Sequence, residues 1–228
     1  QARRQAGELS PYEVIGDEPD HVRSAFCLMV EAEGRRALPL IERLIHLVWG
    51  PDQPRQARAV IHTRVSELRA VLTPHLRDDE GLHTVDTGYH LRVHAKQVDL
   101  HRYHLLLRQA RNAGQPEEAR RLLRTALRLW RGPVMGGWLP ASSYAALCGT
   151  IDSSRLSAME TLFEIEIGLG PDHAVASEIT EAVLANPGYE PLVRLAMTAL
   201  RRVGRTGEAL QVFDHFLRAL ADELGVPP

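Results

Sequence analysis

The sequence predicts a mainly α-helical protein in which a winged-helix domain precedes a domain of tetratricopeptide-like helical hairpins. Residues 96–228 carry apolar residues at helical spacing, interrupted by short breaks rich in glycine and proline. Residues 1–95 show three helical segments and then the alternation of a β-hairpin, which is the element order of a winged helix. Two turns led by Gly170 and Gly204 are 34 positions apart, which is the tetratricopeptide period.

Length and composition favour an ordinary soluble protein. The 228 residues are 44% apolar and 25% charged, and they suffice for two small domains without a stabilising metal or disulfide. Cys27 and Cys148 lie far apart in apolar stretches, which indicates reduced thiols rather than a disulfide framework. Because no secretory signal and no membrane-spanning run is visible, we expect a cytoplasmic protein with no membrane partner.

The distribution of charge is more informative than the net charge of −2. The segment Arg35–Arg77 holds eight arginines and three acidic residues, a local charge of +5, and acidic residues gather at 17–20 and 78–80 on either side of it. A positive segment in a neutral chain is typical of a local phosphate-binding face. The alternative is a solvated, arginine-rich helix face.

Four elements are predicted in the first domain. Asp20–Glu33 is an amphipathic segment ended by glycine, and a second helix begins at Pro39 and ends at Trp49-Gly50. A third helix runs from Pro54 to Leu72. The segment Leu82–Val93 then alternates around Thr87-Gly88, which predicts a β-hairpin.

The third helix has two different faces. One arc of about 80° is apolar and predicts the buried side: Ala57, Ile61, Val65, Leu68 and Leu72. The opposite arc holds Arg55, Ala59, His62, Thr63, Ser66 and Ala70, and Gln56 lies at its edge. Small side chains allow a helix to approach base-pair edges, and Arg58 and Arg69 on the flanks would reach phosphates.

The hairpin also has two faces, because successive side chains in a strand alternate. Tyr89, Leu91 and Val93 form the face that we expect to pack on the helices. His90, Arg92 and His94 form the other face, which we expect to follow a DNA backbone as a wing.

Neither a catalytic nor a metal site is predicted, and no cofactor is expected. His90, His94, His101 and His104 share faces in pairs, but no cysteine or carboxylate stands at ligand spacing among them. Common catalytic and nucleotide-binding motifs are absent from the sequence. Glu160, Glu164 and Glu166 lie on one predicted helix without a basic or nucleophilic partner, so we interpret them as a solvated face.

The second domain is divided by breaks at residues 114–116, 132–140, 168–171, 186–188 and 203–205. Short turns place consecutive helices antiparallel, so about three stacked hairpins are predicted. Gly114 and Gly170 are 56 positions apart, which equals one period and an insertion of 22 that residues 130–154 could supply. An irregular helical bundle is the alternative.

Several segments resemble the Streptomyces antibiotic regulatory proteins, and they occur in that family's order over residues 38–228. The winged-helix part resembles the family's second helix, recognition helix and wing in the segments Arg43–Gly50, Gln53–Arg69 and Gly88–Val93. Three later segments are similar to the bacterial transcriptional activation domain: Val98–Tyr103, Ala126–Pro133 and Ala209–Val226.

This resemblance implies an OmpR-type winged helix that reads the major groove, followed by the tetratricopeptide-like domain. It also implies a pathway-specific activator of a secondary-metabolite gene cluster, with double-stranded DNA, RNA polymerase and its sigma factor as partners. Family members bind direct repeats near the promoter as head-to-tail pairs, so the resemblance implies a homodimer on DNA in the cytoplasm, associated with the nucleoid.

The sequence departs from the family pattern at a few positions. Only Leu9–Val14 resembles a strand of the family's N-terminal sheet, so an abbreviated sheet is expected. Glu67 replaces a commonly basic residue, Arg64 a usual aromatic and Ala70 a frequent arginine. Each lost positive charge weakens phosphate binding. The alternative function is therefore a regulator that keeps the fold but binds a protein or small ligand instead of DNA, for example through the loop from Trp130 to Trp138.

A domain boundary near residue 95 leads to a first testable prediction. A fragment that begins at Lys96 should fold alone as a highly helical unit, because each hairpin is covered by its neighbour. Circular dichroism and thermal unfolding of the fragment measure this. A fragment without helical signal would contradict the boundary.

Overall fold

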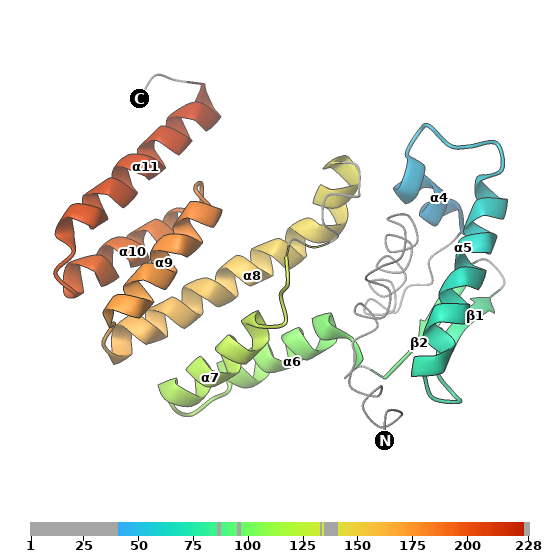
Figure 1. The fold of residues 1–228 in the computed structure, drawn as a ribbon, viewed down its shortest axis with the longest axis horizontal. Helices are drawn as coiled ribbons and strands as arrows, with labels where there is room; N and C mark the ends of the chain where they lie inside the picture. Colours follow the sequence, from blue (N-terminus) through green and yellow to red (C-terminus); the bar gives the residue numbers. More distant parts are fainter. Residues whose placement is uncertain (1–40, 86–87, 95–96, 133, 135–140, 226–228) are drawn as a thin grey trace. The chain divides into compact units, whose positions relative to one another are not determined.

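The computed structural model describes residues 41–225, apart from 86–87, 95–96, 133 and 135–140 (Figure 1). The helix predicted over Asp20–Glu33, the strand over Leu9–Val14 and Cys27 lie outside the described residues. The chain forms two compact units. The first runs to Leu105 and includes Leu129–Ser153, and the second consists of Leu106–Arg128 and the chain from Ser154 onward.

The described part of the first unit contains the second and third predicted helices and the predicted hairpin of the winged helix. Its elements are α4 (Ile41–Trp49), α5 (Ala57–Leu72), the short 3₁₀ helix η2 (Thr73–His75), β1 (Gly81–Val85) and β2 (Gly88–Arg92). One boundary differs from the prediction, because α5 begins at Ala57 rather than Pro54. The amide of Ala57 donates to the Pro54 carbonyl, and Gln56 has non-helical backbone angles as the N-cap. Arg55 and Gln56 therefore precede the helix.

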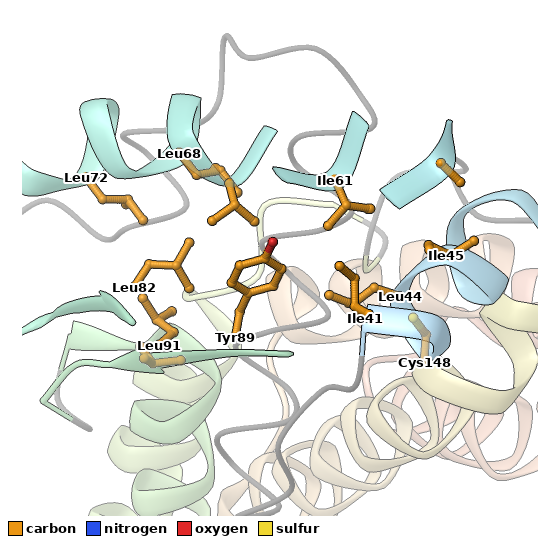
Figure 2. Packing of buried hydrophobic residues seen from close by; sticks show 13 residues of the cluster. Ile41, Leu44, Ile45, Ile61, Leu68, Leu72, Leu82, Tyr89, Leu91 and Cys148 are labelled. Atoms are coloured by element: carbon orange, nitrogen blue, oxygen red, sulfur yellow. The ribbon is translucent and has the colours of Figure 1, made fainter. Parts of the chain in front are cut away.

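The core of the first unit forms where α5 meets the hairpin. All five residues of the predicted apolar arc of α5 are buried. Leu82, Leu91 and the ring of Tyr89 face them from the hairpin, and Leu44 and Ile45 join from α4 (Figure 2). Leu68 at the centre of this contact is 0% exposed, so its apolar surface is removed from water. The predicted inward face of β2 is confirmed.

The register of the hairpin assigns each residue to a face. The strands are antiparallel, with Leu82 opposite Leu91 and Thr84 opposite Tyr89 on the side toward α5. The pair His83–His90 alternates with them and lies on the outer side, and Arg92 is exposed. The hairpin thus presents one apolar and one polar face, as its sequence predicts.

Glu80 joins the two ends of the hairpin. Its carboxylate accepts hydrogen bonds from the backbone amides of Arg77 and His94, at 3.1 and 3.0 Å, and from the side chain of Gln97 at 3.2 Å. Burial alone raises the pKa of Glu80, but these bonds and the charge of Arg77 outweigh it and hold the pKa below its usual range. The ionised carboxylate therefore stabilises the folded hairpin.

The helices of the second domain follow the predicted breaks (Figure 1). They are α6 (Asp99–Arg111), α7 (Pro116–Leu127), α8 (Ala141–Leu169), α9 (His173–Ala185), α10 (Glu190–Arg202) and α11 (Thr206–Leu224). Gly170 and Gly204, one period apart, have φ of 104° and 80°, angles that side chains larger than hydrogen disfavour. Gly114 does not share this conformation, so the turn before α7 differs from the other two.

The long helix α8 accounts for much of the predicted insertion. It has 29 residues, whereas α9 and α10 have 13 each. Its N-terminal part, up to Ser153, belongs to the first unit, where Cys148 is buried in the core. The boundary between the units thus falls inside α6 and α8. No helix in the described part of the chain is long and apolar enough to cross a membrane.

The interpretation of the acidic residues of α8 as a solvated face without basic partners is wrong. Glu166 is buried and accepts a hydrogen bond from Arg124 of α7 at 2.7 Å. Arg124 also binds Glu178 of α9, so one guanidinium connects three helices of the second unit. Arg194 of α10 lies near the other two residues of this set, Glu160 and Glu164, at 3.7 and 3.2 Å. The partners are distant in sequence, so only the fold reveals them.

The anchoring role of Glu80 leads to a prediction about pH. Glu80→Gln should lower the free energy of unfolding of the first unit by about 1 kcal/mol at neutral pH, because a charged acceptor of two backbone amides is lost. A lowered pKa gives stability that is present above the usual glutamate value and is lost as the pH falls through the folded value. The difference between variant and wild type should therefore shrink in acid, as measured by denaturant unfolding across pH. A difference independent of pH would contradict this assignment.

Candidate nucleic-acid interface

The face of α5 opposite the core is exposed and carries mostly small side chains. The predicted residues that lie on it are exposed: Arg58, Ala59, His62, Thr63, Ser66 and Ala70. Arg69 is half-buried instead. The apolar arc of the helix packs against the core, and the opposite arc therefore faces outward. The predicted orientation of the helix is thereby confirmed.

Two hydroxyl groups on this face have defined hydrogen bonds. Thr63 Oγ1 donates to the carbonyl of Ala59, and Ser66 Oγ donates to the carbonyl of His62, both at 3.1 Å. A hydroxyl that donates to its own helix keeps its lone pairs free. On the outer surface of α5, Thr63 and Ser66 therefore offer acceptors rather than donors to a ligand.

His62 is held by the hairpin. Its Nδ1 lies 2.5 Å from the hydroxyl of Tyr89, and the two rings meet edge to face with centroids 5.9 Å apart. Burial raises the pKa of Tyr89, so its hydroxyl stays protonated at neutral pH. The imidazole of His62 is thus fixed through one nitrogen, which leaves Nε2 for a ligand on the exposed face.

Arg69 also contacts the hairpin. Its Nε donates to the backbone carbonyl of Leu82 and its Nη2 to the hydroxyl of Thr84, each at 2.7 Å. These contacts occupy one edge of the guanidinium. The sequence predicts Arg69 only as a flanking phosphate contact, and no periodicity argument could have found its bonds to a strand 13 and 15 residues away.

At the N-terminal end of α5, Arg58 forms an ion pair with Glu42 of α4. Both side chains are largely exposed, at 64% and 65%, so the pair stabilises the fold little and Arg58 remains available to an anion. Arg55 and Gln56 are exposed in the preceding turn. The first turn of α5 contains no acidic residue, and the Gln56 side chain does not cap it. The positive end of the helix dipole thus adds to the arginine charges.

The two unusual charges of α5 neutralise each other. Arg64 Nη1 donates to both carboxylate oxygens of Glu67, at 2.9 and 2.7 Å. The acid at position 67 therefore does not present an unpaired negative charge. The spacing of three residues is the signal that could have predicted this pair from sequence.

The outer face of the hairpin, on the side away from the core, carries three histidines and one arginine: His83, His90, His94 and Arg92. His83 pairs with His90 across the strands, which adds one residue to the predicted set. Arg92 and His94 are exposed, and His90 is half-buried. Among the described residues, no group of three or more histidine, cysteine or acidic side chains is placed to hold a metal ion.

Known proteins resemble both parts of the chain. Residues 98–228 match the bacterial transcriptional activator domain. The regulatory protein AfsR of Streptomyces coelicolor is 37% identical over 210 residues, which are 90% of this chain and 20% of AfsR. The regulatory protein DnrI of Streptomyces peucetius is 27% identical over 197 residues, which are 82% of this chain and 72% of DnrI. The chain thus spans about a fifth of AfsR but most of DnrI.

A solved structure supports the same fold. Mycobacterium tuberculosis EmbR, in complex with a low-affinity phosphopeptide, superposes with a TM-score of 0.70 at 28% identity. The match covers 92% of this chain and 56% of EmbR. The mainly α-helical fold class, a winged helix followed by tetratricopeptide-like hairpins, is therefore confirmed. With its activator domain and its similarity to these regulatory proteins, this chain belongs to the bacterial transcriptional activator domain family and is of the Streptomyces antibiotic regulatory protein type.

Proposed function

We propose that this chain activates transcription of an antibiotic biosynthetic gene cluster by binding double-stranded DNA, with α5 in the major groove and the hairpin along the adjacent backbone. The observation that carries this proposal is the exposed face of α5. Its small side chains permit close approach to base-pair edges, while its opposite face is locked in the core. Salt-dependent binding to host promoter DNA tests it directly.

The proposed contacts fall into two groups. His62, Thr63 and Ser66 lie on the central face of α5 and would read bases. Arg55, Gln56, Arg58, His90 and Arg92 lie around that face or on the wing and would contact phosphates. Because the hydroxyls of Thr63 and Ser66 already donate to the helix, they favour base groups that donate, such as the amino groups of adenine and cytosine.

We further propose that the chain acts in the cytoplasm, at the nucleoid, as a homodimer on direct repeats near a promoter. RNA polymerase and its sigma factor would be its protein partners. The relatives named as regulators, and the activator domain at residues 98–228, support this role. We infer no catalytic activity, since these relatives are regulators.

A DNA-independent regulator remains the second candidate. It is favoured by the internal bonds of Arg64 and Arg69, which reduce the number of arginines on α5 that are available to DNA phosphates. Such a protein would bind no host promoter at any salt concentration. Genome-wide mapping of occupied sites in the host, followed by titration of those sites in vitro, separates the two candidates.

Arg92 tests the wing. Arg92→Ala should weaken binding to all DNA sequences about equally and reduce the slope of log affinity against log salt by about 1, because one phosphate contact is lost. Titrations of cognate and scrambled duplexes at several salt concentrations measure both quantities. A changed base preference with an unchanged slope would place Arg92 on a base edge instead.

Thr63 tests base reading. Thr63→Ala should cost roughly 1–3 kcal/mol on the cognate site and much less on random DNA, because a contact to a base edge is sequence-dependent. Thr63→Val keeps the side-chain volume and removes only the hydroxyl, so it separates the hydrogen bond from packing. Arg58→Ala should show the opposite pattern, with similar losses on both duplexes. Equal losses on both duplexes for Thr63→Ala would show that this face does not read bases.

A further inference from the structure

Side-chain hydrogen bonds attach both strands of the hairpin to α5. Arg69 binds β1 through the Leu82 carbonyl and the Thr84 hydroxyl, and Tyr89 of β2 binds His62. His62 and Arg69 are seven residues apart, which is about two helical turns. Two points along the same helix therefore fix the hairpin, in addition to the apolar core beneath it.

Arg69 holds β1 through two hydrogen bonds, to the Leu82 carbonyl and the Thr84 hydroxyl, and we call this pair of bonds the clamp. Its Nε and Nη2 form one edge of the planar guanidinium, and the hairpin occupies both donors. Arg69 is half-buried, and its positive charge lowers the pKa of Tyr89, which burial raises more strongly. The guanidinium thus lies among hairpin groups, and a phosphate could not use the same edge without releasing β1.

The clamp acts beside the residue that we assign to the DNA backbone. Arg92 stands directly opposite Gly81, and Gly81 is the neighbour of Leu82, whose carbonyl Arg69 holds. Fixing Leu82 therefore fixes the strand position from which Arg92 projects. We propose that Arg69 is a positioning residue that holds the wing at the recognition helix, so that the phosphate contact of Arg92 depends on it. This inference rests on the proposed DNA-binding function.

A double-mutant cycle between Arg69 and Arg92 tests the proposal. If Arg69 acts through Arg92, Arg69→Ala alone should weaken promoter binding by about tenfold, but less than about twofold in the Arg92→Ala background, because interacting sites are not additive. The salt slope of the double variant should equal that of Arg92→Ala. The opposite result is that the affinity loss of the double variant equals the product of the two single losses, and that its salt slope is smaller by about 1 than that of Arg92→Ala. This result would show that Arg69 contacts a phosphate itself, and it would overturn the proposal.

Thr84→Val provides a test that removes no charge. It deletes one acceptor of the clamp, so it should weaken promoter binding about two- to fivefold, a fraction of the Arg69→Ala effect. Thr125→Val is the matched control, since Thr125 is exposed on α7 and its hydroxyl bonds only within that helix. An unchanged affinity for Thr84→Val would show that the bond to Thr84 does not support DNA binding, and a tighter affinity would show that it competes with DNA; either result would overturn the proposal.

Hydrogen exchange separates failure of this proposal from failure of the DNA-binding function. Arg69→Ala should speed exchange of the β1 and β2 amides while those of α10 keep their wild-type rates, because the clamp is local. Unchanged exchange in the hairpin would overturn the clamp, even if promoter binding is intact. Faster exchange in a protein that binds no host promoter would retain the clamp and reject the proposed function. If Arg69→Ala does not fold, Thr84→Val provides the same measurements.

Discussion

The winged-helix unit depends on the contact between the apolar arc of α5 and the inner face of the hairpin. Leu68, Val65 and Leu72 are almost entirely removed from water, and Leu91 and Tyr89 cover them. Burying a side chain of this size contributes about 1.5–3 kcal/mol, so this contact outweighs any single polar interaction on the surface. It also decides which face of α5 is left for a ligand.

Tyr89 connects this core to the candidate interface. Its ring packs in the core (Figure 2), and its hydroxyl forms a hydrogen bond with the exposed His62 of α5. A buried tyrosine hydroxyl requires a hydrogen-bond partner, and here the partner is a residue on the exposed face of α5. The packing of the hairpin on α5 is therefore coupled to the position of the His62 imidazole, since a shift of the hairpin would move this side chain as well.

The second unit shows a different way of joining helices. Arg124 bonds with the buried Glu166 and with Glu178, and burial, which would lower its pKa, is outweighed by these carboxylates, which raise it. A buried carboxylate without a cation would be strongly destabilising. The residues of this network come from α7, α8 and α9. Their hydrogen bonds therefore hold these three helices in one packing arrangement, which the turns between the helices do not specify by themselves.

Among the described residues, the sequence alone determined the helices, apart from the first residues of α5, together with the hairpin and the face of α5 that turns outward. Each of these follows from local periodicity or from turn residues, as with Gly170 and Gly204, whose positive φ matches their glycine identity. Side-chain partners far apart in the chain were decided only by the tertiary structure. The bonds of Arg69 to β1 and the burial of Glu166 beside Arg124 depend on how whole elements pack, and periodicity carries no information about that.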